Sequence, residues 1–428
     1  MKVGLVGLGY VGLPLALAFS RAGAEVLGVD SDPGKIERLR AGESYIGHID
    51  SARVAEAVLG GRLTPSSDFA VLAAADAILI CVPTPLGTHR EPDLSFVTGT
   101  ARQLAPHLRR GVLVVLESTT YPGTTEEVLL PMLESGSGLK AGIDFHLAYS
   151  PEREDPGNPE SRLSAIPKVV GGLTPVCLER ALAVYRLVVS ETVPVSSCRA
   201  AEATKLLENI FRCVNIALVN ELKVVYAAMG IDVWEVIAAA RTKPFGFMPF
   251  YPGPGLGGHC IPIDPFYLTW KAREYDQDTR FIELAGEINR SMPQYVIGRV
   301  AEALGERHKA VRGSRVLVLG LAYKPGVDDD RESPSYVLMD LLRASGADVA
   351  YYDPYVPAIK PTRRHAHWAG TRSISWDRDT VAGFDLALIA TKHAGVNYHE
   401  LAAWVPLIVD TRDAMAGVPV APGVLWKA

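Results

Sequence analysis

Short apolar runs alternate along the chain with stretches in which apolar residues recur at helical spacing. Residues 3–6 form an apolar run, a Gly-rich turn and a helical stretch follow, and residues 25–29 form the next strand. Further strands are predicted over 77–82 and 111–116, each followed by turn residues. Strands that alternate with helices in this way predict a parallel, doubly wound sheet.

A single long helix is predicted over residues 202–229. Apolar residues recur there at helical spacing without Gly or Pro, and Gly230 supplies a left-handed stop. Asp232, three residues before Glu235, predicts the start of the next helix through a capping box. We expect the long helix to connect two domains.

A second strand–turn–helix unit is predicted in the last third of the chain. An apolar strand over 315–319 ends at Gly320, and residues 333–334 (Ser-Pro) suit the cap and first turn of a helix. Residues 349–354 repeat the pattern of 26–33, in which an acidic residue and a proline follow a strand. The Gly-x-Gly-x-x-Gly pattern is missing, so this unit should not cradle a dinucleotide in the usual way.

The fold class that these elements predict is α/β: two Rossmann-like doubly wound domains joined by a long central helix. We expect an N-terminal domain over 1–200, a central helical domain over 201–305 and a C-terminal domain over 306–428. A chain of 428 residues with 48% hydrophobic residues can bury cores for several domains.

Charge and cysteine content narrow the class of partner. A net charge of −5 provides no basic stripe for nucleic acid and no polybasic membrane patch, so a small-molecule ligand is favoured. The five cysteines form neither a Cys-x-x-Cys pair nor a zinc-ligand spacing, which predicts reduced thiols in the cytoplasm and no metal site. Glycines and Pro14 interrupt the apolar start after Lys2, so we interpret it as strand, turn and helix rather than a signal peptide.

The first turn carries a dinucleotide-binding fingerprint. Gly7, Gly9 and Gly12 allow a tight turn, close approach of a pyrophosphate and packing of helix on strand. Asp30 follows Gly12 by 18 residues at a strand end, where its carboxylate would accept the ribose 2′-hydroxyl and repel a 2′-phosphate. This context favours NAD over NADP, and a ligand-free Gly-rich turn is the less favoured alternative.

Three polar residues follow predicted strands at the carboxyl edge of the sheet, where open α/β sheets bind ligands. Thr84 and Thr119 are candidates to donate hydrogen bonds to cofactor or substrate, although such hydroxyls more often cap helices. Glu152 is a candidate base or water-positioning group, and the local sequence by itself favours a solvated acidic loop.

One face of the long helix carries Lys205, Asn209 and Arg212 at positions i, i+4 and i+7. A solvated stripe is the more frequent outcome for such a face. If Lys205 and Asn209 face a cleft instead, they are suited to stabilise an oxyanion and to orient a water molecule. The apolar residues expected on the core side are Leu206, Leu207, Ile210, Phe211 and Val214.

The most distinctive segment is the Gly/Pro-rich stretch over 250–264, which combines aromatic residues with a thiol, Cys260. Such loops usually line ligands. A free cysteine is more often an inert core residue, but glycines beside Cys260 allow a ligand to approach, and Asp264 follows four residues later. An inert thiol and a nucleophile both stay open from these residues alone.

Taken in order, these segments closely resemble the UDP-glucose/UDP-N-acetylhexosamine 6-dehydrogenase family over nearly the whole chain. The resemblance implies an N-terminal NAD domain, a central helix that forms a homodimer and a C-terminal domain that binds UDP. The most specific stretches are 7–12, 82–85, 117–119, 150–152, 202–205 with Asn209, 257–260 with Asp264, and Lys324 with 331–333.

The resemblance also implies a role for each matching residue. The catalytic set is Cys260 as nucleophile, Lys205 and Asn209 as the oxyanion and water-positioning pair, Asp264 as acid/base partner, and Thr119 and Glu152 as helpers. The residues implied in NAD binding are Gly7, Gly9, Tyr10, Val11, Gly12, Asp30, Lys35, Thr84, Thr119 and Arg331. The residues implied in substrate binding are Glu152, Lys205, Asn209, Phe250, Tyr251, Gly253, Gly257 and Lys324.

The implied reaction removes four electrons from one carbon in two hydride transfers without releasing an aldehyde. After the first transfer Cys260 would trap the aldehyde as a thiohemiacetal, the second transfer would give a thioester, and water would release the acid. Lys205 is suited to stabilise the oxyanion of each tetrahedral species, and Asp264 and Glu152 are candidates for activating water.

Two features bear on the sugar. UDP-glucose dehydrogenases commonly carry a lysine immediately before the aspartate, where this chain has Ile263. Residues 150–158 and 243–247 look like the branch that acts on UDP-N-acetylglucosamine, so we expect that substrate. UDP-glucose, UDP-N-acetylmannosamine and UDP-N-acetylgalactosamine are alternatives, and a non-catalytic nucleotide-sugar binding protein or a two-electron dehydrogenase are alternatives from other classes.

Overall fold

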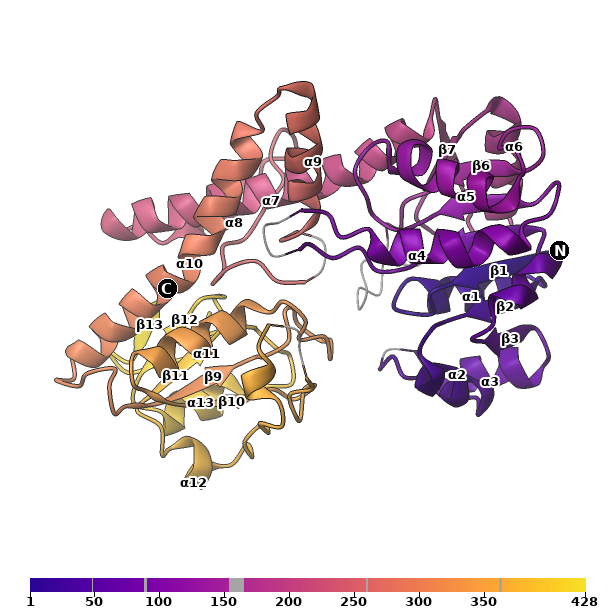
Figure 1. The fold of residues 1–428 in the computed structure, drawn as a ribbon. Coiled ribbons are helices and arrows are strands. Elements are labelled where there is room, and N and C mark those ends of the chain that lie inside the picture. The colour runs from indigo at the N-terminus through magenta and orange to yellow at the C-terminus, as the bar shows by residue number, and fades with distance from the viewer. Residues whose placement is uncertain (48, 88–90, 154–164, 259–260, 362–363) are drawn as a thin grey trace. The chain divides into compact units, whose positions relative to one another are not determined.

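The computed structural model describes residues 1–47, 49–87, 91–153, 165–258, 261–361 and 364–428 (Figure 1). The chain divides into two compact units, and one division falls inside the long helix. The expected boundaries of three domains stay a prediction. The first unit comprises Met1–Asn209 and Ile263–Asp278, and the second comprises Ile210–Pro262 and Thr279–Ala428.

The first unit is built on an eight-stranded sheet with the order β3-β2-β1-β4-β5-β6-β7-β8. The order of β1 to β6 is the one typical of dinucleotide-binding folds. Neighbouring strands are parallel except β6 and β7, which are antiparallel. The strands are β1 (Lys2–Val6), β2 (Glu25–Val29), β3 (Leu63–Ser66), β4 (Ala77–Ile80), β5 (Leu113–Leu116), β6 (His146–Tyr149), β7 (Lys168–Gly172) and β8 (Thr192–Val195).

Helices pack on both faces of this sheet, which is why its central strands are apolar at every position. Leu79 of β4 joins a core cluster with residues of α1 and α6, whereas Ile78 and Ile80 join a second cluster with residues of α4 and α5. The helices of this unit are α1 (Gly12–Arg21), α2 (Pro33–Arg40), α3 (Ser51–Leu59), η1 (Phe69–Ala74), α4 (Ser95–Leu104), η2 (Ala105–His107), η3 (Thr124–Leu129), α5 (Leu130–Ser137), α6 (Pro175–Tyr185), α9 (Asp264–Ala272) and η5 (Arg273–Tyr275).

The second unit contains a five-stranded parallel sheet with the order β10-β9-β11-β12-β13. The prediction of two Rossmann-like sheets and a long helix is therefore confirmed. Its strands are β9 (Arg315–Leu319), β10 (Asp348–Tyr352), β11 (Leu386–Ile389), β12 (Ile408–Asp410) and β13 (Leu425–Lys427). Its helices are α8 (Val233–Ala240), α10 (Arg280–Gly305), α11 (Pro334–Ala344), η6 (Ala366–Trp368), α12 (Arg378–Val381) and α13 (Tyr398–Trp404).

The long helix is α7 (Cys198–Ala228), with 31 residues. It begins earlier than predicted and is followed by Gly230, whose φ is +73° as expected for a left-handed stop. Asp232 caps α8 as predicted, because its side chain accepts a hydrogen bond from the Trp234 amide at 3.0 Å. Neither α7 nor another helix in the described ranges has the length and apolarity needed to cross a membrane.

Candidate active site

The turn after β1 has the backbone geometry that a dinucleotide requires. Gly7 has a φ of +89°, and a Cβ atom there would lie 2.6 Å from the Cys81 carbonyl oxygen. A Cβ atom at Gly12 would lie 1.8 Å from the Gly7 carbonyl oxygen, whereas one at Gly9 would meet no atom within 4 Å. The turn itself therefore requires Gly7 and Gly12, while Gly9 leaves its backbone open to a pyrophosphate.

Asp30 follows β2 and fixes the same turn. Its Oδ2 accepts a hydrogen bond from the Leu8 amide at 2.8 Å, and Lys35 Nζ lies 3.2 Å from the same oxygen. Asp30 is buried, so Lys35 balances a charge that is largely withdrawn from water. The predicted ribose acceptor thus also shapes the glycine turn, beside which the predicted cofactor residues Tyr10 and Val11 are partly buried.

Two loops at the carboxyl edge of the sheet are joined by Thr84. Its Oγ1 donates a hydrogen bond to the Thr119 carbonyl oxygen at 2.7 Å, and its own carbonyl oxygen accepts one from the Tyr267 hydroxyl of α9. Thr84 therefore bridges the loops after β4 and β5 instead of capping a helix. The Thr119 side chain is partly exposed at this edge.

A buried ion pair lies beneath the loop that carries Glu152. Lys168 Nζ is 2.6 Å from Glu117 Oε2, donates to the Pro151 carbonyl oxygen at 3.0 Å and lies 3.8 Å from Glu152 Oε2. The Tyr185 hydroxyl donates to the other oxygen of Glu117. Burial raises the pKa of Glu117, and Lys168 opposes that shift. Lys168 therefore fastens the Glu152 loop to the sheet, a role that local sequence did not indicate.

Lys205 and Asn209, on the polar face of α7, are buried and form hydrogen bonds. Lys205 Nζ donates a hydrogen bond to the Glu152 carbonyl oxygen. Asn209 Nδ2 donates to Asp264 Oδ2 at 2.6 Å, which joins α7 to α9. Lys205, Asn209 and Asp264 are 8%, 2% and 4% exposed. The structure thus brings together four of the residues predicted to be catalytic.

The solvated stripe that helix statistics favoured for this face is wrong. Leu207 and Phe211, expected on the core side, are instead 67% and 48% exposed. Leu206 is buried as expected, and Arg212 is exposed at the far end of the polar face. The helix spacing correctly predicted which residues share a face, but not which face is covered.

Glu202 anchors the start of α7. Its carboxylate accepts hydrogen bonds from the Gly123 amide at 2.6 Å and from the Thr125 amide and hydroxyl at 2.9 and 2.7 Å. Burial raises the pKa of Glu202 to about 7, although these donors oppose the shift. Residues 202–205 were among the stretches that resemble the family, but the resemblance implied no role for the Glu202 carboxylate.

The predicted substrate loop lies in the second unit. The Gly253 amide donates a hydrogen bond to Asn220 Oδ1 at 2.9 Å, and Phe250 packs edge-on against Phe211 at 5.5 Å between ring centroids. Tyr251 stacks on Trp234 at 5.8 Å. The loop is therefore held on α7 by a hydrogen bond and the Phe250 contact, and on α8 by the stacking of Tyr251.

Close packing surrounds the glycines that follow. A Cβ atom at Gly257 would lie 2.8 Å from both Pro334 and Tyr323. Lys324, the predicted substrate lysine, places its Nζ 5.9 Å from the centre of the Tyr323 ring. The predicted cofactor contact Arg331 forms hydrogen bonds with both carboxylate oxygens of Asp329 at 2.7 and 2.6 Å. Gly257, Lys324 and Arg331 thus lie in the second unit.

Sequence reasoning missed two cations in the second unit, the buried Lys223 and the partly buried Arg412. A Cβ atom at Gly253 would lie 2.4 Å from the Arg412 guanidinium. Burial lowers the pKa of Arg412 to about 10. Burial, with Arg412 nearby, also lowers the pKa of Lys223 to about 7. Lys223 Nζ has no hydrogen-bond partner among the described residues. The alternation of polar and apolar residues along α7 gave no sign that Lys223 is buried.

The nucleophile predicted from the sequence, Cys260, lies outside the described residues, and so does His259. Its role therefore stays a prediction. The other four cysteines, Cys81, Cys177, Cys198 and Cys213, are free and buried. Burial raises the pKa of Cys213 to about 11 and that of Cys81 above its usual range, which suits inert thiols rather than nucleophiles.

The side chains gathered in the first unit suit chemistry at a carbonyl group. Lys205 provides a nearly buried ammonium group, which stabilises a developing oxyanion more strongly than an ammonium group in water would. Asn209 orients the carboxylate of Asp264, a geometry suited to a general base. The glycine turn with Asp30 provides the elements of an NAD site in the same unit.

Three family models match the chain in order. They describe the NAD binding domain over residues 1–189, the central domain over 199–291 and the UDP binding domain over 317–417 of the UDP-glucose/GDP-mannose dehydrogenase family. Together they cover most of the sequence.

Individual relatives agree with these models. The UDP-N-acetyl-D-glucosamine 6-dehydrogenase of Pseudomonas aeruginosa is 40% identical over 359 residues, or 84% of each chain. The UDP-N-acetyl-D-mannosamine dehydrogenase of Pyrococcus horikoshii is 35% identical over 426 residues, covering 98% of this chain and 97% of that one. A solved structure of UDP-D-ManNAc dehydrogenase from P. horikoshii has a TM-score of 0.90 at 33% identity and covers 100% of this chain and 99% of its own. The chain therefore belongs to the UDP-glucose/GDP-mannose dehydrogenase family and is an NAD-dependent UDP-sugar dehydrogenase.

Proposed function

We propose that this enzyme oxidises the C6 alcohol of a UDP-N-acetylhexosamine, with UDP-N-acetylglucosamine as the first candidate, to the uronate. The observation that carries the proposal is the buried set of Lys205, Asn209 and Asp264, in which Lys205 contacts the Glu152 loop and Asn209 contacts Asp264. The likeness to the P. aeruginosa UDP-N-acetyl-D-glucosamine 6-dehydrogenase and the presence of Ile263 before Asp264 support the choice of sugar.

NAD, held at the glycine turn beside Asp30, would supply the hydride acceptor for each of two oxidations at C6. The alcohol first loses a hydride and a proton to give the aldehyde. The thiolate of Cys260 adds to the aldehyde carbon, and the oxygen takes up a proton to give a thiohemiacetal. Loss of a second hydride and of that proton gives a thioester. Water then adds, the C–S bond breaks, and the carboxylate is released with the thiolate restored.

The described side chains divide the remaining work among them. Lys205 stabilises the oxyanion of each tetrahedral species, an effect of about 3–4 kcal/mol for a well-placed donor. Asp264, held by Asn209, accepts the proton of the attacking water. Glu152 is held by Lys205 through its carbonyl oxygen and by Lys168 beneath the loop, so it positions substrate and water.

The direct test is the ratio of NADH formed to sugar consumed. Purified enzyme should give two NADH per UDP-sugar without free aldehyde, and Cys260→Ser should abolish formation of the acid. Cys213→Ser is the matched control, because this buried thiol lies against Asn289 and should leave the ratio at two. One NADH per sugar with free aldehyde, or full turnover by Cys260→Ser, would contradict the mechanism.

A second candidate substrate is UDP-N-acetylmannosamine, favoured by the P. horikoshii relative that covers nearly the whole chain. Values of kcat/KM for UDP-GlcNAc, UDP-GalNAc, UDP-ManNAc and UDP-glucose decide between them. We expect the highest value for UDP-GlcNAc. A higher value for UDP-ManNAc would replace the first candidate without changing the chemistry.

A homodimer through α7 belongs to the same proposal. Leu207, Leu218 and Met229 of this region are 67%, 51% and 65% exposed, an apolar surface suited to a second copy of the chain. Sedimentation should give twice the chain mass, and Leu218→Glu should give the monomer.

We also propose a cytoplasmic location, supported by the free thiols, and delivery of the uronate to cell-surface polysaccharide. Cell fractionation tests the location, and polysaccharide analysis of a deletion strain tests the delivery.

A further inference from the structure

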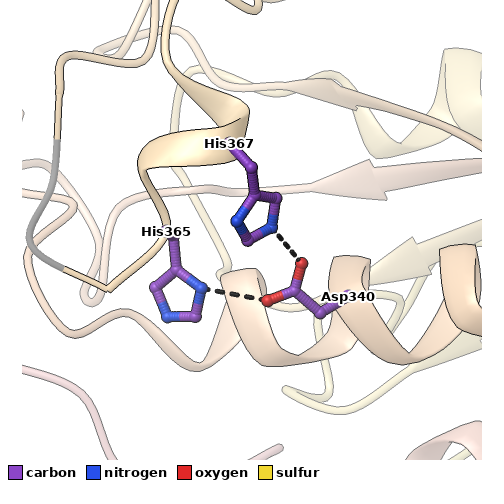
Figure 2. Close-up of side chains that lie close together, drawn as sticks. All are labelled: Asp340, His365 and His367. Carbon is purple, nitrogen blue, oxygen red and sulfur yellow. Dashed lines mark hydrogen bonds and ion pairs between the residues drawn. The ribbon is translucent and has the colours of Figure 1, made fainter.

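Asp340, His365 and His367 form a compact group in the second unit, outside the candidate active site (Figure 2). His365 Nδ1 lies 3.0 Å from Asp340 Oδ2, and His367 Nε2 lies 2.6 Å from Asp340 Oδ1. One potential ligand atom from each residue lies within 4.8 Å of the other two. Both imidazoles point toward the same carboxylate from the segment that faces α11.

Neighbouring side chains orient this group. Trp368 Nε1 donates a hydrogen bond to Asp340 Oδ1 at 2.8 Å, and the His365 ring stacks on Tyr336 at 4.8 Å with 11° between the ring planes. Tyr336 is fully buried and therefore a firm support. Outer partners that fix carboxylate and imidazole ligands in this way are typical of metal sites.

We propose that Asp340, His365 and His367 bind a late first-row divalent cation, with Zn²⁺ as the reference ion. Imidazole nitrogen and carboxylate oxygen suit this class of ion, at distances of about 2.0–2.2 Å. Tetrahedral ligands at such distances lie roughly 3.3 Å apart, so small side-chain shifts separate the present arrangement from a coordinated one. Water fills the fourth position.

The sequence spacing did not reveal this site, because Asp340 and His365 are 25 residues apart and no cysteine takes part. The carboxylate also has a competing cation, since Arg343 Nη2 lies 3.8 Å from Asp340 Oδ1 while its guanidinium stacks on Trp368 at 4.1 Å. The bound ion must overcome this positive charge, so we expect micromolar rather than tighter affinity.

Binding of the ion would fasten the segment around η6 to α11. The same segment carries Arg364, whose Nη1 lies 3.2 Å from Glu332 Oε2. Glu332 has a φ of +51° and lies next to Arg331 in sequence. The site is thus suited to a structural ion that stabilises the turn before α11, and its occupancy does not depend on the proposed dehydrogenase chemistry.

Equilibrium dialysis of the full chain against Zn²⁺ tests the proposal. Cys260→Ser is introduced first, because that thiol is an alternative zinc ligand. We expect one ion per chain near pH 7.5. Asp340→Asn, His365→Gln and His367→Gln should each weaken binding at least about tenfold. His399→Gln, which alters an exposed histidine of the same unit, is the matched control and should bind normally.

A second measurement is the shift in melting temperature on adding Zn²⁺. Because each variant is compared with itself without zinc, a general loss of stability in a variant does not affect this shift. Zn²⁺ should raise the melting temperature of the parent and of His399→Gln but not of the other three, and Mg²⁺ should raise none. Equal zinc binding by all variants, or no binding by the parent at about 100 µM free Zn²⁺, overturns the proposal. The second result would mean that the group is held by hydrogen bonds alone.

Discussion

The turns after β1 and β9 have the same backbone geometry in the two Rossmann-like sheets. Gly7 has a φ of +89° and Gly320 one of +88°. The Gly7 amide donates to the Val29 carbonyl oxygen at 2.8 Å, and the Gly320 amide donates to that of Tyr352 at 2.9 Å. In each sheet the first strand is therefore tied to the second at the same point, and an aspartate follows shortly after.

The two aspartates differ in how fully their oxygens are used. Asp30 accepts the amides of Leu8 and Asp32 and lies beside the partly exposed Lys35. Asp353 accepts four amides, and His393 Nε2 lies 3.1 Å from it, with both side chains completely buried. The same position thus serves as a candidate ligand acceptor in one sheet and as a structural centre in the other. The four amides come from Leu321, Ala322, Tyr355 and Val356.

The protonation state of the Asp353 site follows from its contacts. The Gly326 amide donates to His393 Nδ1 at 3.3 Å, so Nε2 carries the hydrogen that points to Asp353. Burial raises the pKa of Asp353, but His393 and the amides outweigh that effect and hold the pKa below its usual value. The carboxylate is therefore ionised at neutral pH and has little capacity left for a ribose hydroxyl.

Replacing the saturated carboxylate should have the largest effect. Asp353→Asn leaves two of the four buried amides without an acceptor and should lower the free energy of unfolding by about 3–5 kcal/mol in urea titrations. Because the folded-state pKa is lowered, this contribution is present above the unfolded pKa near 4 and lost as pH falls through the folded value. The gap between parent and variant should therefore narrow in acid. An equal loss of the free energy of unfolding in Asp30→Asn would show that the two aspartates contribute equally to stability.

The two units also differ in how a lysine is paired. Lys35 has a carboxylate partner, whereas Lys223 has none among the described residues. Lys223→Met should raise the free energy of unfolding by about 2–4 kcal/mol at pH 7. Its pKa of about 7 lies below the unfolded value of 10.5, so stability of the parent should rise with pH across that interval.

The Lys223→Met variant should lose this pH dependence. Lys360→Met, at an exposed position of the same unit, should leave both the stability and its pH profile near those of the parent. A destabilised Lys223→Met variant with an unchanged profile would show that Lys223 has a partner in solution.

Asp30→Asn should affect cofactor binding more than folding. Loss of the charged acceptor should weaken NAD binding about tenfold, roughly 1.4 kcal/mol, and reduce discrimination against NADP, measured by titration calorimetry. Asp32→Asn keeps a good helix cap on α2 and should bind NAD normally. Equal NAD affinity in the two variants would make Asp30 a purely structural residue like Asp353.

The smallest effect is expected for Lys35→Met. The ion pair with Asp30 is one-third exposed on the lysine side, so its loss should cost less than about 1 kcal/mol of stability. Thermal melts at low and high salt check this, because salt should remove most of the difference. A loss as large as that of Asp353→Asn would mean that Asp30 is as tightly held as its counterpart.

The sequence predicted the repeated pattern but not the difference within it. An aspartate after a strand is visible at both Asp30 and Asp353, whereas saturation of Asp353 depends on His393, 40 residues away. The same holds for Lys168 and Glu117, which are 51 residues apart and meet only after β5 and β7 have taken their places. Local patterns predict elements, and long-range contacts decide which carboxylates stay available.

Helical spacing had a similar limit on α7. It correctly placed Lys205 and Asn209 on one face, because 3.6 residues per turn is a property of the helix alone. Burial of that face depends on Asp264 of α9 and on the Glu152 loop, neither of which the periodicity of α7 contains. The roles of these residues followed from family resemblance, and the structure supplies contacts that are compatible with them.

The attachment of the predicted substrate loop has a consequence for redesign of sugar preference. Asn220 holds the loop through the backbone amide of Gly253, and Asn289 Oδ1 in turn accepts a hydrogen bond from Asn220 Nδ2 at 2.8 Å. The side chain of Tyr251 takes no part in this chain of amides. Libraries that vary position 251 therefore leave the anchor intact, while a side chain at position 253 would displace the Arg412 guanidinium. The loop thus offers an engineer one freely variable site beside one at which any side chain would also move Arg412.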